Sequence, residues 1–89
     1  MADVEKTLII NKDTFKVIRL ALKAGASVPE HSANAHVVVI PVKGQGTFTI
    51  GKESQAISAG KVLEMEPNVM HAVQAETDLE IMVIQIRHH

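Results

Sequence analysis

Residues 37–50 read VVVIPVKGQGTFTI, and this stretch decides the fold class of the chain. Residues 37–42 are aliphatic or proline throughout, so both faces of an extended chain are apolar here, as in a strand buried on both sides. Gly44, Gln45 and Gly46 mark a turn, and residues 47–50 resume with β-branched and aromatic side chains. The stretch therefore predicts a β-hairpin inside an all-β domain.

The same pattern of short apolar runs and turn residues continues on both sides of this stretch. No window combines helical periodicity with a cap and a stop signal. About eight or nine strands are expected, in a single domain of residues 1–89 that forms a barrel or jelly-roll sandwich, because closure or double-sheet packing protects strand edges. The other predicted strands are residues 8–10, 15–22, 55–57, 61–65, 70–75 and 79–86.

Composition excludes several classes of function. The 89-residue chain has a formal net charge of −1, two phenylalanines, no Trp or Tyr and no cysteine. A basic nucleic-acid surface, an aromatic stacking platform, disulfides and thiolate metal sites are therefore not expected. There is no signal-peptide pattern, and the longest aliphatic run is far below the roughly 20 residues that span a bilayer. We expect a cytoplasmic protein without a nucleic-acid or membrane partner, and a homodimer, because so small a domain gains from burying an apolar strand face.

Two segments combine glycine, proline and histidine: GASVPEH at residues 25–31 and GKVLEMEPNVMH at residues 60–71. Each places a histidine, His31 or His71, after a proline turn at the start of a predicted strand. Imidazole ligates transition metals and changes charge near neutral pH. Brought together in a barrel, the two rings would ligate a metal or contact a substrate. The alternative is that each is a loop or rim histidine bonded to a backbone carbonyl.

With these residues in view, the chain resembles a small single-domain cupin over roughly residues 15–87. The first cupin motif has a glycine, His-x-His, then a glutamate and a closing glycine. Here the first histidine matches His31 and the closing glycine matches Gly44, whereas Ala33 and Val37 occupy the second histidine and glutamate positions. The resemblance implies a double-stranded β-helix, the cupin-type jelly-roll barrel.

The second cupin motif has a glycine, a proline-containing turn and a histidine. Gly60, Pro67 and His71 match these positions, while Lys61 replaces the usual acidic residue after the glycine. Metal-binding cupins use three histidines and one glutamate, and this chain keeps two of those four positions.

His36 is the candidate third metal ligand beside His31 and His71, and it lies one residue before the glutamate position. Successive strand residues point to opposite faces, so His36 points outward if Val37 points inward, unless a β-bulge reverses the order. The resemblance implies at most one divalent transition metal, namely Zn, Fe, Ni, Cu or Mn.

Two histidines alone would hold a metal only weakly, so Gln45, Gln74, Glu64 or water would have to supply the additional ligands. The terminal His88 and His89 are either native or the remainder of a purification tag, and they are set aside.

The resulting functional interpretation is a small cupin barrel that binds a small molecule in its pocket, with or without a histidine-ligated metal. Two alternatives stay open at this point. One is a metal-dependent enzyme of the dioxygenase or isomerase type, and the other is a non-catalytic dimerisation module. The sequence does not decide whether the protein is an enzyme.

Overall fold

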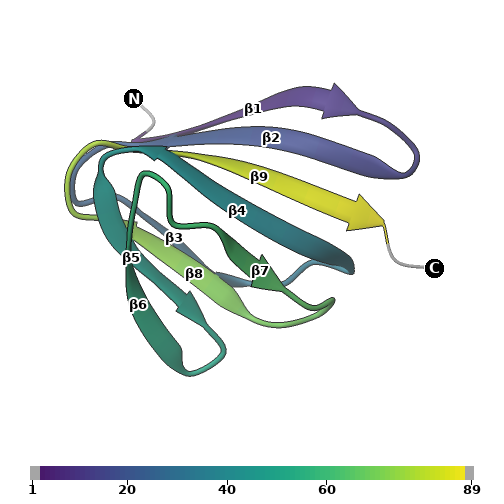
Figure 1. The fold of residues 1–89 in the computed structure, drawn as a ribbon. Coiled ribbons are helices and arrows are strands. Elements are labelled where there is room, and N and C mark those ends of the chain that lie inside the picture. Colours follow the sequence, from purple (N-terminus) through teal and green to yellow (C-terminus); the bar gives the residue numbers. More distant parts are fainter. Residues whose placement is uncertain (1–2, 88–89) are drawn as a thin grey trace.

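The computed structural model describes residues 3–87, which form nine β-strands and no helix (Figure 1). Within this part of the chain, no helix is long and apolar enough to cross a membrane. The two terminal histidines lie outside the described residues. The strands are β1 (Val4–Asn11), β2 (Phe15–Leu22), β3 (Ser27–His31), β4 (Ala35–Lys43), β5 (Gln45–Ile50), β6 (Glu53–Ser58), β7 (Leu63–Met65), β8 (His71–Ala75) and β9 (Leu79–Arg87).

The strands form two antiparallel sheets that face each other (Figure 1). One sheet has the order β1-β2-β9-β4-β7 and the other has the order β3-β8-β5-β6. Strands that are distant in the sequence pair with each other, as β2 does with β9 and β3 with β8. The prediction of an all-β jelly-roll arrangement is confirmed.

The predicted hairpin at residues 37–50 is wrong. β4 pairs with β7 and β9, whereas β5 pairs with β6 and β8, so the chain crosses between the sheets instead of folding back. Gly44 makes the crossing with a φ of 86°, a conformation that side chains other than glycine rarely adopt. A Cβ atom at Gly44 would overlap the carbonyl oxygen of Asp78. This corner therefore requires a glycine both for its conformation and for its lack of a side chain.

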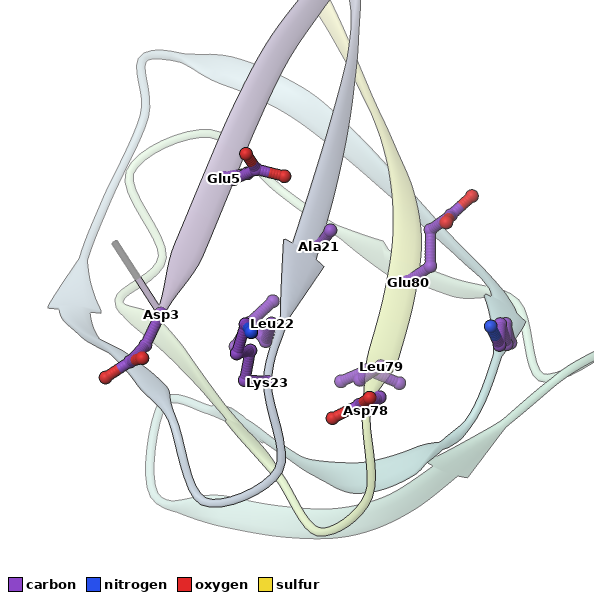
Figure 2. Close-up of a pocket in the computed structure, with 9 residues that line it drawn as sticks. Asp3, Glu5, Ala21, Leu22, Lys23, Asp78, Leu79 and Glu80 are labelled. Atoms are coloured by element: carbon purple, nitrogen blue, oxygen red, sulfur yellow. The ribbon is translucent and has the colours of Figure 1, made fainter. Parts of the chain in front are cut away.

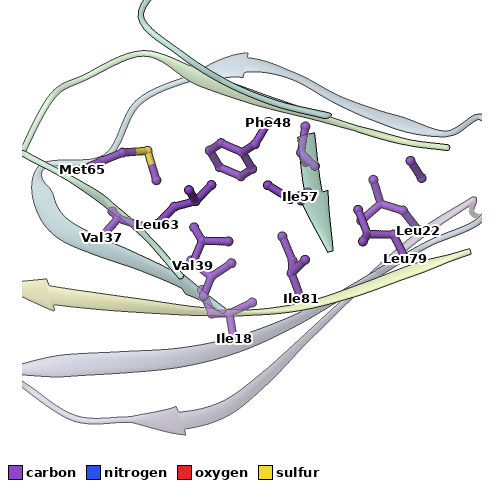
Figure 3. Packing of buried hydrophobic residues seen from close by; sticks show 13 residues of the cluster. Ile18, Leu22, Val37, Val39, Phe48, Ile57, Leu63, Met65, Leu79 and Ile81 are labelled. Atoms are coloured by element: carbon purple, nitrogen blue, oxygen red, sulfur yellow. The ribbon is translucent and has the colours of Figure 1, made fainter. Parts of the chain in front are cut away.

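The hydrophobic core fills the space between the two sheets (Figure 3). On β4 the inward residues Val37 and Val39 are 2% and 1% exposed, while Val38 and Ile40 face away and are half-buried. The expectation that this strand is buried on both sides is therefore wrong. The opposing sheet covers one face only, and within residues 3–87 nothing covers the other.

Candidate functional site

A cavity of about 120 Å³ lies between the sheets. Most of its wall is formed by inward-facing aliphatic side chains and by Phe48. Four polar side chains also line it: Lys6 from β1, His31 from β3, His71 from β8 and Gln85 from β9. An apolar pocket with a few polar groups is the usual form of a small-molecule site.

His31 and His71 meet at this cavity because β3 and β8 are neighbouring strands. The two residues are register partners, and their ring centroids lie 4.2 Å apart at an interplanar angle of 62°. His31 ends β3 instead of starting a strand as expected, whereas His71 starts β8 as expected. The expectation that these two histidines lie close together agrees with this geometry, and their role as ligands stays a prediction.

Both imidazoles are fixed by the same hydrogen-bond pattern. The Nδ1–H of His31 donates to the carbonyl of Pro29 at 2.9 Å, and that of His71 donates to the carbonyl of Val69 at 3.0 Å. A carbonyl oxygen only accepts, so Nδ1 carries the proton in each ring. Each neutral ring therefore keeps a free lone pair on Nε2.

The two rings differ in their surroundings. His31 is exposed, whereas His71 is only 8% exposed and stacks on Phe48 with ring centroids 6.0 Å apart. Burial lowers the pKa of His71 below 6.5, the bond to the Val69 carbonyl opposes this, and the nearby His31 adds to the lowering. Desolvation disfavours the charged form of an imidazole. His71 is therefore a neutral group at pH 7.

His36 does not reach the cavity. It lies on the outer face of β4, where its Nε2 is 2.8 Å from a carboxylate oxygen of Glu64 and its Nδ1 is 3.5 Å from one of Glu66. No register shift occurs at this end of β4, so strict alternation turns Val37 inward and His36 outward.

The expected helper ligands do not line the cavity either. Gln45, Gln74 and Glu64 are exposed and none of them contributes to its wall. Gln85 and Lys6 line it instead, and neither was expected from the sequence. Gln85 shares the inward phase of Leu79, Ile81 and Val83 in β9, and that was its available signal, whereas Lys6 lies between the polar Glu5 and Thr7 and carries no such signal. The expected first strand began only at residue 8 and so left Lys6 out.

A larger hollow of about 430 Å³ lies along β1, β2 and β9 and is drawn in Figure 2. Four carboxylates line it, and Figure 2 shows them apart from one another, pointing to no common centre. They belong to Asp3, Glu5, Asp78 and Glu80. One of them is already engaged, because Asp78 accepts a hydrogen bond from the backbone N–H of Ala24 at 2.9 Å. We therefore place the functional site in the smaller, more apolar cavity that holds the histidine pair.

Comparison with known families accounts for this architecture. A family model described as "Cupin domain" matches residues 18–86. The chain belongs to the cupin family. A search of curated proteins found no match.

Solved cupin structures superpose on nearly the whole chain. An RmlC-like cupin from Desulfovibrio desulfuricans is 27% identical, with a TM-score of 0.86 over 93% of this chain and 81% of that one. An RmlC-like cupin with a double-stranded β-helix fold from Methanocaldococcus jannaschii is 24% identical, with a TM-score of 0.86 over 98% and 84%. A predicted oxalate decarboxylase from Thermotoga maritima is 24% identical, with a TM-score of 0.89 over 96% and 81%. These likenesses establish the cupin double-stranded β-helix fold.

The metal set of three histidines and one glutamate does not fit this cupin. Residues 3–87 contain no group of three or more His, Cys, Asp or Glu side chains that could hold one ion. Val37, at the glutamate position, presents an aliphatic side chain to the cavity, and it is 2% exposed. The donors present are the two imidazole Nε2 atoms and the Gln85 amide, which is fewer strong ligands than a structural or catalytic metal site uses.

Proposed function

We propose that this cupin binds a small molecule in the cavity between its sheets, with His31 and His71 as its polar contacts. One observation carries the proposal: two imidazoles from separate motifs meet 4.2 Å apart at a mostly apolar cavity, each with a free Nε2 atom. An engineered apolar cavity of about 150 Å³ accommodates benzene. The natural occupant is therefore on the order of six non-hydrogen atoms.

Thermal unfolding in the presence of small ligands tests this proposal. The probe set contains neutral and charged molecules of about six non-hydrogen atoms. A ligand that binds only the folded state stabilises it, by about 2.7 kcal/mol when its concentration is 100 times Kd. We expect at least one probe to raise Tm in the native protein, with the shift lost in His31→Ala.

His36→Ala is the matched control, because it removes the same side chain from the outer face of the sheet. The probe-induced shift should persist in this variant. If no probe raises Tm, or if His36→Ala abolishes the shift as fully as His31→Ala does, binding between the sheets is refuted and the dimerisation-module alternative gains support.

A histidine-ligated transition metal is the second candidate, which would make this cupin a metal-dependent binder or enzyme. The observation that favours it is the pair of Nδ1–carbonyl bonds, since metal-ligating histidines commonly donate their second ring N–H to such an acceptor. Elemental analysis of a chain lacking His88 and His89 is the test. Metal at one ion per chain that disappears in His31→Ala supports this candidate, and absence of metal removes it.

We also propose that the protein forms a homodimer through the outer face of the five-stranded sheet. The side chains of Val38, Ile40, Met82 and Ile84 lie on this face, and within residues 3–87 no other element packs over them. Their half-burial comes from their neighbours in the sheet, and Val42 and Ile86 at its ends are 44% and 43% exposed. A contiguous apolar sheet face of this kind is typical of an interaction surface.

A second copy of the chain suits this face because the charges beside the apolar stripe are complementary. The basic Arg19 on β2 flanks one side, and the acidic Glu64 on β7 and Glu66 directly after it flank the other. A twofold axis running along the strands between β4 and β9 would set β2 of one copy opposite β7 of its partner. Both charge pairs of such an isologous interface would then form at once.

A further inference from the structure

We infer that the occupant of the cavity is a small aliphatic hydroxycarboxylate, and that Lys6 is the residue that pairs with its carboxylate. The inference rests on the proposed function, since it names the chemical class of the molecule bound there. Three observations carry it: the position of Lys6, the charge of the cavity wall, and the lone pairs that the histidines present.

Lys6 faces the inside of the barrel although it is on an edge strand. It is the register partner of Leu20, whose side chain also lines the cavity, and the chain neighbours Glu5 and Thr7 alternate to the outer face. The side chain of Lys6 is exposed to solvent and also contributes to the cavity wall. Among residues 3–87 the close contacts of a basic side chain with a carboxylate are those of His36 with Glu64 and Glu66, so the ammonium of Lys6 has no acidic partner there.

The charge of the cavity wall favours an anion. Among the described residues that line it, Lys6 is the one permanent charge, and neither aspartate nor glutamate is present. His71 adds no charge to the wall, because burial lowers its pKa and keeps the imidazole neutral at pH 7. The ammonium of Lys6 therefore makes this wall more favourable for an anion than for a cation.

The remaining polar groups specify what else the anion carries. The two Nε2 lone pairs accept hydrogen bonds, and a carboxylate cannot donate one. A hydroxyl group on the same molecule can donate to either ring. Apart from Gln85 and Phe48, the rest of the wall is aliphatic, and it matches a short hydrocarbon body. Inorganic phosphate offers no apolar part to that wall and is the poorer match.

Three probes of matched size separate these features: lactate has both the carboxylate and the hydroxyl, lactamide lacks the charge, and propionate lacks the hydroxyl. Binding is measured by calorimetry, with chemical-shift mapping by NMR of the backbone amides of β3 and β8. We expect lactate to bind several-fold more tightly than lactamide, because the ammonium of Lys6 attracts a carboxylate more strongly than a neutral amide oxygen. Lactate should also bind more tightly than propionate, and its affinity should fall with added salt.

Lys6→Met removes the ammonium and keeps an unbranched apolar stem. It should equalise the affinities for lactate and lactamide. Lys52→Met is the matched control, because Lys52 is exposed in the turn between β5 and β6, away from the cavity, and its loss should leave the preference for lactate intact. The lactate-to-lactamide comparison in the native protein needs no variant, so the inference remains testable if Lys6→Met does not fold.

The possible results separate the inference from the proposed function. If lactamide binds as tightly as lactate and shifts the β3 and β8 amides, the carboxylate inference is overturned while binding in the cavity stands. If propionate equals lactate, the hydroxyl requirement is overturned. If none of the three probes shifts those amides, the hydroxycarboxylate inference is overturned, whereas the proposed function falls only if the broader probe set also fails to raise Tm.

Discussion

Replacing Gly44 by alanine tests whether the crossing between the sheets is what closes this barrel. Gly44 has a φ of 86°, and a Cβ atom there would overlap the carbonyl oxygen of Asp78 and also lie 2.9 Å from the carbonyl carbon. The obstruction is backbone, and the next residue, Leu79, is 2% exposed and packed in the core. Relief of the overlap therefore requires movement of the β9 start against the core.

Two costs add in Gly44→Ala. Alanine in a left-handed conformation costs about 1–2 kcal/mol, and forcing extra volume into a packed region costs a further 1–3 kcal/mol or so. The expected loss in unfolding free energy is therefore about 2–5 kcal/mol, a large fraction of the roughly 5–15 kcal/mol of a typical domain.

Gly51→Ala isolates the first cost. Gly51 has a φ of 62° and nothing lies within 4 Å of the position that a Cβ atom would take, so the substitution brings conformational strain without overlap. Both variants replace glycine by alanine and so lower the entropy of the unfolded chain by a similar amount. This contribution largely cancels when the two variants are compared. Urea unfolding should show Gly44→Ala less stable than Gly51→Ala by about 1–3 kcal/mol. Equal losses would refute the steric argument at the Gly44 corner.

Three further predictions concern His71, the outer sheet face and the His36 ion pair. Because the pKa of His71 is lowered from 6.5 in the folded state, the unfolded chain binds more protons just below that pH, so stability falls as pH drops below 6.5. Urea unfolding at pH 7.5 and 5.5 should show this loss, and His71→Phe should reduce it; an unchanged pH dependence would contradict the assignment. Ile40→Lys should yield a monomer by light scattering where the native protein is a dimer, and a native monomer at micromolar concentration would refute the interface. Glu64→Gln should change the unfolding free energy by less than about 1 kcal/mol, because its pair with His36 is exposed, and a larger loss measured in urea would show that this pair supports the sheet.

The strands with strong alternation were predictable from the sequence. Three alternate residues are apolar on one face of each strand, and the predicted ranges of 15–22 and 79–86 agree with β2 (Phe15–Leu22) and β9 (Leu79–Arg87) to within one residue. β3 was not predicted as a strand because it contains Pro29 and Glu30. It is an edge strand, where a missing N–H is tolerated, and the register shift after Val28 relaxes the alternation further.

The crossing at Gly44 shows a different limit of sequence reasoning. A glycine-rich turn between two apolar runs has the same local signature whether the chain folds back on its own strand or passes to a second sheet. The distinction is made by the long-range partners of each strand, β9 and β7 for β4 and β8 and β6 for β5. A single sequence contains no local signal for those pairings.

The site was predictable to the extent that it follows from motif positions. The glycine, proline and histidine spacing led to His31 and His71, and the structure places their rings 4.2 Å apart. Strict alternation, without a bulge, explains why His36 does not join them. Lys6 could not be foreseen, because it reaches the cavity through the pairing of β1 with β2. Gln85 was missed although it continues the inward positions of β9.

The combination of Val37 and Lys6 alters the electrostatics of the cavity relative to a metal-binding cupin. A glutamate at position 37 would supply the negative charge that stabilises a cation, whereas Val37 supplies none. Lys6 then adds a positive charge to the same wall, which opposes a divalent cation and favours an anion. The two histidines remain compatible with either occupant, since a free Nε2 atom serves as a metal ligand or as a hydrogen-bond acceptor. Lys6 is therefore the residue that distinguishes the two proposals: Lys6→Met should weaken binding of a carboxylate, but it should strengthen binding of a metal ion at the same pair of imidazoles.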